Sequence, residues 1–159
     1  MLKSFYFTLL LLVCSEVLSA QKISIIPEPT SITPKEGFFT LTTTTAIIAQ
    51  TKDELKSANF LNEYFKSCYG FTLPVKPKGS SGIIIKASKG TKDGYHLNIN
   101  KNTALITGTT APCAFYGIQS LIQLLPTEKK AVLQVPAVSI TDAPAVPYRG
   151  LMLDGSRHI

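Results

Sequence analysis

The sequence TAPCAFYGIQSLIQLLP at residues 110–126 is the strongest local indication of the fold. Apolar side chains recur in it at steps of three and four residues, the pattern of one buried helix face; they are Ala111, Ala114, Phe115, Ile118, Leu121, Ile122 and Leu125. Thr110 can cap the first turn, where Pro112 is tolerated, and Pro126 ends the helix. Gly117 costs the helix up to about 1 kcal/mol relative to alanine, so we expect close packing of this helix on a sheet.

A second helix is predicted at residues 51–70. Thr51-Lys52-Asp53-Glu54 has the spacing of a capping box, apolar side chains follow at helical spacing, and Gly70 can adopt the left-handed conformation that ends a helix. Asp53 and Glu54 form the only adjacent acidic pair in the sequence. Such a pair could supply catalytic carboxylates, but at the start of a helix, capping and interaction with the helix dipole are strongly favoured.

The other apolar segments predict strands, at residues 23–26, 38–41, 46–49, 83–85, 95–100, 103–107 and 132–140. The first stops at Pro27-Glu28-Pro29, a turn is expected at residues 35–37, and Ile83–Ile85 is expected to be covered on both faces. His96 falls on the polar side of a predicted hairpin, which favours a solvent-facing histidine over a ligand. The fold class is therefore α+β, with a small, largely antiparallel sheet covered by two helices.

The first twenty residues have the composition of a signal peptide. Lys3 is followed by a ten-residue apolar run from Phe5 to Cys14, and small residues near Ala20 suit cleavage. The run is too short to span a bilayer, so we expect export to the periplasm or the medium and no membrane span. A lipoprotein acylated at Cys14 is the less favoured alternative, because Val13 is bulkier than the residue such processing prefers.

Composition argues against several classes of function. The formal net charge is +6, but the lysines are spread singly apart from the pair Lys129-Lys130, and no aromatic residues interleave with a basic cluster, so nucleic-acid binding is not expected. No ligand spacing predicts a metal site, and no cofactor is expected. After export, Cys68 and Cys113 could form a disulfide, although free buried thiols are favoured.

The end of the sequence differs from the rest. Residues 142–147, DAPAVP, are predicted to form a linker, since closely spaced prolines bar helix and strand pairing. Both arginines of the chain follow, Arg149 and Arg157, and between them Gly150–Leu153 is predicted to be a buried strand. We therefore expect the chain to be the front part of a larger protein.

Several blocks of this sequence resemble family 20 glycoside hydrolases, the β-N-acetylhexosaminidases. The blocks are Tyr116 to Leu125, Asp142 to Pro144, Pro147 to His158 and, more weakly, Ile26 to Pro29. The resemblance implies an N-terminal α+β domain at residues 21–141, a linker at 142–147, and the first strand of a (β/α)₈ barrel, truncated here, at 148–159. Ala145-Val146 and Gly155 depart from the family pattern.

The resemblance also implies an activity. Enzymes of this family remove terminal N-acetylglucosamine or N-acetylgalactosamine from glycans with retention, and the substrate's own acetamido oxygen acts as the nucleophile. Their catalytic Asp-Glu pair lies on a later barrel strand, beyond residue 159. The segment alone is therefore expected to lack activity, and to contain no catalytic residue.

Arg149 matches the arginine that, in this family, hydrogen-bonds hydroxyls of the terminal sugar, and a planar guanidinium suits neighbouring hydroxyls. An ion pair at the domain interface is its alternative role. Asp154 matches an acid near the open end of the barrel, where it could support the sugar site from behind or serve a structural role with Arg157.

A second hypothesis assigns the chain a function of another kind. The chain could be a free-standing exported α+β module that binds glycans or proteins without catalysis. Exposure of Leu151 to Leu153 separates the two, because a complete module would bury that strand.

Overall fold

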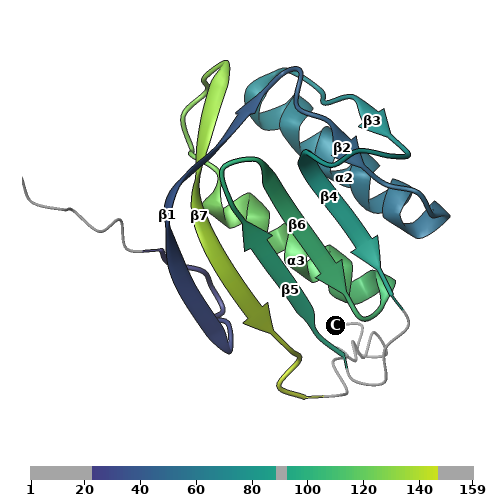
Figure 1. Cartoon of the computed structure of the whole chain (residues 1–159), viewed down its shortest axis with the longest axis vertical. Coiled ribbons are helices and arrows are strands. Elements are labelled where there is room, and N and C mark those ends of the chain that lie inside the picture. The colour runs from purple at the N-terminus through teal and green to yellow at the C-terminus, as the bar shows by residue number, and fades with distance from the viewer. Residues whose placement is uncertain (1–22, 89–92, 147–159) are drawn as a thin grey trace, which may run out of the picture.

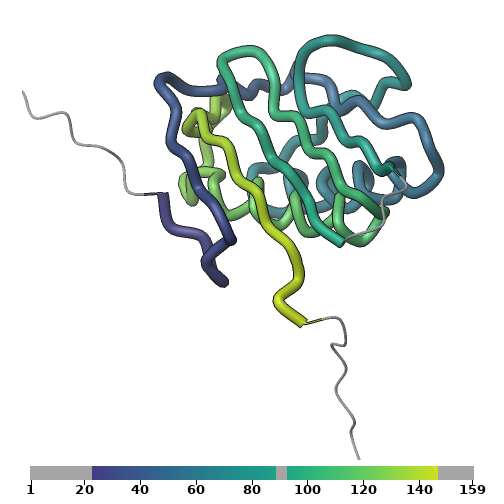
Figure 2. The backbone as a smooth tube through the Cα atoms, turned by 60° about the horizontal axis from the view of Figure 1, so that its bottom comes forward, coloured from purple at the N-terminus to yellow at the C-terminus, as the bar shows by residue number. Residues whose placement is uncertain are grey.

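The computed structural model describes residues 23–88 and 93–146 and shows one sheet with two helices packed on one of its faces (Figures 1 and 2). The sheet has seven strands in the order β1-β7-β5-β6-β4-β2-β3. The elements are β1 Ser31–Thr42, β2 Ile47–Ile48, α2 Lys52–Tyr69, β3 Val75–Lys76, β4 Gly82–Ala87, β5 Tyr95–Ile99, β6 Thr103–Gly108, α3 Ala111–Leu124 and β7 Val132–Asp142.

The sheet is mixed rather than largely antiparallel. β1, β7, β5 and β6 pair antiparallel in that order, whereas β6, β4, β2 and β3 pair parallel. The connection from β2 to β3 contains α2, and a helical crossover returns the chain in the same direction. The expected hairpin, β5 and β6, is confirmed, and its turn is held by the Asn100 side chain, which accepts hydrogen bonds from the backbone N–H groups of Asn102 and Thr103.

The N-terminal part differs from the expectation. Residues 23–26 are not a strand but part of an irregular segment with a cis peptide bond between Ile26 and Pro27. The expected turn at residues 35–37 lies within β1, where the pairing register shifts between Pro34 and Phe38 and Gly37 has φ of 94°. Pairing with β7 therefore overrides the local turn signal and keeps Ser31–Thr42 as one bulged strand.

Both predicted helices are confirmed. α2 begins with the complete capping box between Thr51 and Glu54 and ends at Gly70, with φ of 82°. α3 has Thr110 as its N-cap and proline in its first turn. A Cβ atom on Gly117 would lie 2.6 Å from Cγ2 of Ile106 in β6, so the close packing inferred from this glycine is also confirmed.

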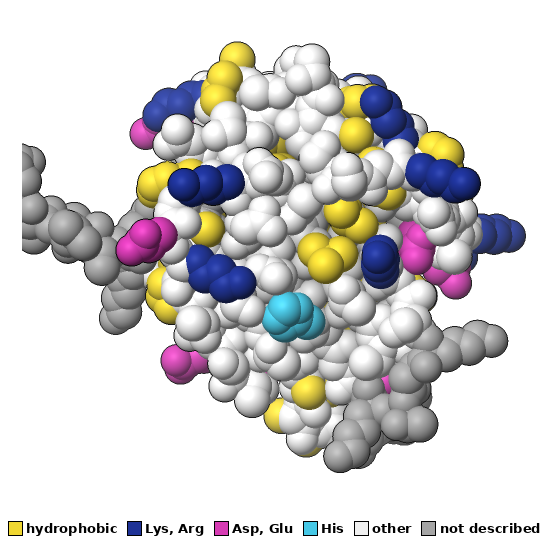
Figure 3. All heavy atoms as spheres, viewed as in Figure 1, with side chains coloured by type: hydrophobic (Ala, Val, Ile, Leu, Met, Phe, Trp, Pro, Cys, Tyr) yellow, Lys and Arg dark blue, Asp and Glu magenta, His cyan; other side chains and the backbone are white. Residues whose placement is uncertain are grey.

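The core lies between the sheet and the helices, where Leu61, Phe65, Ile118, Leu121, Ile83, Leu97 and Ile106 are fully buried. The other face of the sheet has no helix over it among the described residues (Figure 1). Ile84 on that face is only half-buried, so the expected cover on both sides of residues 83–85 is not found. Lysines are spread singly over this face (Figure 3).

Candidate functional site

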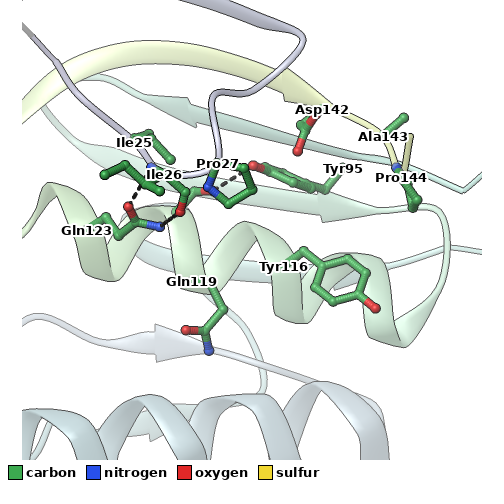
Figure 4. A pocket seen from close by; sticks show the side chains of 11 residues that line it. Ile25, Ile26, Pro27, Tyr95, Tyr116, Gln119, Gln123, Asp142, Ala143 and Pro144 are labelled. Atoms are coloured by element: carbon green, nitrogen blue, oxygen red, sulfur yellow. Dashed lines mark hydrogen bonds between the residues drawn. The ribbon is translucent and has the colours of Figure 1, made fainter. Parts of the chain in front are cut away.

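The site residues predicted from the sequence, Arg149 and Asp154, lie outside the described residues, as do the predicted signal peptide and barrel strand. In the described part of the chain, a pocket beside α3 is a candidate site, because polar and apolar side chains from distant segments line one cavity there (Figure 4).

This pocket lies between the segment Ile25–Pro27, one side of α3 and the end of β7. Its cavity has a volume of about 360 Å³ and is lined by Ile25, Ile26, Pro27, Tyr95, Tyr116, Gln119, Ser120, Gln123, Asp142, Ala143 and Pro144. Segments that are distant in the sequence therefore meet around one cavity, which no local pattern could have indicated.

Side-chain hydrogen bonds hold the N-terminal segment in place. The amide of Gln123 pairs with the backbone of Ile26: its Oε1 accepts from the Ile26 N–H at 2.9 Å and its Nε2 donates to the Ile26 carbonyl at 3.0 Å (Figure 4). The Asp142 carboxylate accepts from the backbone N–H and the hydroxyl of Thr30, at 3.1 and 3.0 Å. We call residues 23–30 the strap, because these bonds tie it across α3 and β7.

The polar groups of the pocket are suited to binding rather than to proton transfer. Tyr95 and Ser120 share a buried hydrogen bond of 2.6 Å between their hydroxyl oxygens. Burial raises the pKa of Tyr95 and outweighs the lowering by the Ser120 hydrogen bond, so the phenol stays neutral at ordinary pH. The Asp142 carboxylate also faces this pocket, and it accepts hydrogen bonds from Thr30.

The acidic pair at residues 53 and 54 serves the start of α2, as favoured from the sequence. The Glu54 carboxylate accepts backbone hydrogen bonds from Gln50 at 2.8 Å, Thr51 at 3.0 Å and, across the domain, Ala87 at 3.0 Å. Burial alone would raise the pKa of Glu54, but these bonds outweigh it and lower the pKa. Asp53 instead lies on the surface beside Lys56. The sequence predicted the cap but not the link to β4.

The other candidate residues have structural surroundings. Cys68 and Cys113 are free thiols, in agreement with the favoured interpretation. His96 is half-buried on the open face of the sheet, 3.0 Å from the Ser139 hydroxyl. Within residues 23–88 and 93–146, no three His, Cys, Asp or Glu side chains are grouped to hold a metal ion, and no helix is both long and apolar enough to cross a membrane.

Comparison with known proteins gives consistent matches. The sequence model of "Glycosyl hydrolase family 20, domain 2" matches residues 22–143. A β-hexosaminidase of Porphyromonas gingivalis is 33% identical over 148 residues, which cover 86% of this chain and 19% of the relative. A β-hexosaminidase of Vibrio vulnificus is 32% identical over 137 residues, which cover 84% and 15%. The chain thus spans about a fifth or less of the length of these two relatives.

Solved structures show the same arrangement of the chain. The N-acetyl-β-hexosaminidase of Streptomyces plicatus superimposes with a TM-score of 0.75 at 30% identity, over 84% of this chain and 29% of that one. The family 20 β-N-acetylhexosaminidase of Streptomyces coelicolor gives a TM-score of 0.74 at 28% identity, with the same two coverages.

Proposed function

The chain belongs to glycoside hydrolase family 20, and from this we propose that it is the N-terminal part of a β-N-acetylhexosaminidase that hydrolyses terminal N-acetylglucosamine or N-acetylgalactosamine from glycans. The observation that carries the proposal is the match over 86% of this chain to a protein named β-hexosaminidase. One structure of the Streptomyces plicatus enzyme contains N-acetylglucosamine as product, and this supports the choice of substrate class.

In the proposed enzyme, residues 1–20 direct export, residues 21–141 form the α+β domain, residues 142–147 are the linker, and residues 148–159 begin a catalytic barrel. Hydrolysis proceeds with retention, and the acetamido oxygen of the substrate is the nucleophile. The catalytic Asp-Glu pair belongs to the barrel beyond residue 159. The surroundings of Glu54 and Tyr95 support this division, since each is committed to contacts within the α+β domain.

Arg149 is the residue of this chain proposed to bind substrate. Its guanidinium would donate to neighbouring hydroxyls of the terminal sugar, which a fixed planar fork suits better than a flexible ammonium. Asp154 is proposed to lie behind this site and to orient groups that contact the sugar.

The test compares the full-length protein with residues 21–159 on a chromogenic N-acetyl-β-D-glucosaminide. We expect the full-length protein to release the chromophore and the shorter chain to release none, because the catalytic pair is missing from it. A folded full-length protein that cleaves neither this substrate nor the corresponding N-acetyl-β-D-galactosaminide would contradict the proposal and favour a non-catalytic binding module.

A further inference from the structure

The strands β2 to β6 contain no acidic residue. The charged residues within them are Lys76 in β3 and Lys86 in β4, and both are exposed. Figure 3 shows lysines within the open face of the sheet, whereas acidic side chains lie toward its rim. This face therefore attracts anions more strongly than cations, and the attraction is greatest where two lysines border the same space.

Two lysines line one hollow between the end of β1, the start of β4 and the turn from β5 to β6. The hollow has a volume of about 510 Å³, and its polar lining includes Lys76, Lys101, Thr40, Ser80 and Ser81. We call it the hydroxyl hollow. No carboxylate is part of its described lining, and neither ammonium group has a hydrogen-bond or ion-pair partner within residues 23–88 and 93–146. The hollow therefore carries two positive charges that no neighbouring acid neutralises.

The walls of the hydroxyl hollow are held in place by the fold. The backbone N–H of Gly82 at the start of β4 donates to the carbonyl of Asn102 in the turn, at 3.1 Å. The stem of Lys101 lies against β1, where a Cβ atom on Gly37 would be only 3.0 Å from Cε of the lysine. The glycine in the bulge of β1 thus leaves room for this stem. Walls that are already ordered lose little conformational entropy when a ligand binds.

The lining of the hollow indicates the class of ligand. Ammonium groups donate to anionic oxygens, and hydroxyl groups both donate to and accept from the hydroxyls of a sugar. Phe39, the aromatic residue of the described lining, is 2% exposed and offers no ring for base stacking, which disfavours single-stranded nucleic acid. An acidic sugar matches both kinds of group, because it combines an anionic group with several hydroxyls.

We propose that the hydroxyl hollow binds an acidic sugar residue of a glycan, with Lys76 and Lys101 on its anionic group and with Thr40, Ser80 and Ser81 on its hydroxyls. The inference rests on the proposed function, from which it takes glycans as the class of ligand. The hollow holds the glycan without cleaving it. A terminal N-acetylhexosamine elsewhere on the same glycan then stays at a high local concentration near the enzyme.

The experiment measures binding to the full-length protein by isothermal titration calorimetry. The probes are a galacturonate tetrasaccharide, a sulfated chondroitin tetrasaccharide and the neutral maltotetraose. We expect at least one of the two acidic tetrasaccharides to bind, and maltotetraose to show no measurable binding. The two acidic probes distinguish a carboxylate from a sulfate as the preferred anionic group.

The double variant Lys76→Gln, Lys101→Gln should bind the acidic tetrasaccharide at least about tenfold more weakly, because both charge-assisted contacts are lost. The matched control is the double variant Lys86→Gln, Lys129→Gln, which removes the same charge from two exposed lysines outside the hollow. Its affinity should change by less than about twofold, since distant exposed charges are screened. Circular dichroism shows that each variant remains folded.

The hydroxyl groups are tested separately. The double variant Ser80→Ala, Ser81→Ala keeps both lysines, and it should weaken binding of the tetrasaccharide by about threefold or more, because hydrogen bonds to sugar hydroxyls are lost. Unchanged affinity in this variant would show that the hollow recognises charge alone and would contradict its assignment to a sugar.

Equal losses of affinity in the two lysine double variants would overturn the proposal and assign binding to the net charge. Failure of both acidic tetrasaccharides to bind, or equally tight binding of single-stranded DNA of the same charge, would overturn it as well. The chromogenic hexosaminide is neutral, so its hydrolysis should be the same in Lys76→Gln, Lys101→Gln as in the unmodified protein. Hydrolysis without glycan binding would overturn this inference alone, and glycan binding without hydrolysis would overturn the proposed function alone.

Discussion

Glu54 is the residue that links the start of α2 to the sheet. Its side chain is 6% exposed and accepts hydrogen bonds from three backbone N–H groups, two of them at the helix start and one at the end of β4. The carboxylate thus takes the position that an external anion could occupy at a helix N-terminus. It cannot also serve as a catalytic acid, because both of its oxygens are engaged.

We expect Glu54→Gln to destabilise the chain by about 1–3 kcal/mol, since the new amide nitrogen faces backbone donors. Because the folded state lowers the pKa of Glu54 from 4.5, the contribution of the carboxylate is complete well above pH 4.5 and is lost as the pH falls through the lowered value. Urea unfolding at several pH values measures this loss in the unmodified chain and its absence in Glu54→Gln.

Asp53→Asn is the matched control for that measurement. Asp53 is exposed and pairs at 3.1 Å only with the exposed Lys56 among the described residues, so its removal should change the free energy of unfolding by less than about 0.5 kcal/mol. Equal effects of the two substitutions would contradict the role given to Glu54.

Arg149 gives a second test at the scale of a residue. In the full-length protein, Arg149→Ala should cost roughly 2–4 kcal/mol of transition-state stabilisation, which lowers kcat/KM by about 30- to 900-fold. Arg157→Ala is the control, since no contact with substrate is proposed for it, and it should leave kcat/KM nearly unchanged. An unaltered kcat/KM in Arg149→Ala would remove Arg149 from the sugar site.

At the scale of elements, the sequence predicted α2 and α3 because their signals are local. A capping residue, helical spacing and a terminal glycine or proline all lie within residues 51–70 for α2 and 110–126 for α3, and each was found where expected. Strands were predicted less well because their partners are distant. Ile23–Ile26 alternates like a strand, but its backbone pairs with the Gln123 side chain, 97 residues away for Ile26, and not with a strand. The pocket beside it could not be predicted for the same reason.

The contact of α3 with the sheet depends on Gly117. A methyl group there would meet Cγ2 of Ile106 at 2.6 Å and Cδ2 of Tyr95 at 3.2 Å, so the helix would have to move outward. We expect Gly117→Ala to destabilise the chain by about 1–3 kcal/mol despite the better helix propensity of alanine, because overpacking exceeds that gain of at most about 1 kcal/mol. Thermal unfolding measures the difference.

The exposed Ser67 in α2 provides the comparison for Gly117. Ser67→Ala raises helix propensity without a new contact, so it should be neutral or slightly stabilising. If Gly117→Ala stabilised the chain as much as Ser67→Ala does, α3 would have room to move and the close contact would not be required.

At the scale of the whole molecule, the described residues form one folded unit held by contacts between distant segments. β1 lies beside β7, and Thr30 is bonded to Asp142 across 112 residues of sequence. The two ends of the unit are therefore joined through β1 and β7, which lie side by side at one edge of the sheet (Figure 2). The sequence indicated a domain of this size and class, whereas the bonds that tie the strap to Gln123 and Asp142 could not be predicted, because their partners are about a hundred residues apart.

The reaction rates of the two thiols measure how readily this folded unit opens. Cys113 is 1% exposed at the start of α3, whereas Cys68 is half-buried on α2, and both are free. In residues 21–159 without reductant, we expect a thiol reagent to modify Cys68 readily and Cys113 only as fast as the structure opens, so denaturant should abolish the difference. In Cys68→Ser, only the slow modification of Cys113 should remain. If no thiol reacted in denaturant until reductant was added, the two cysteines would form a disulfide, and α2 and α3 would be linked covalently.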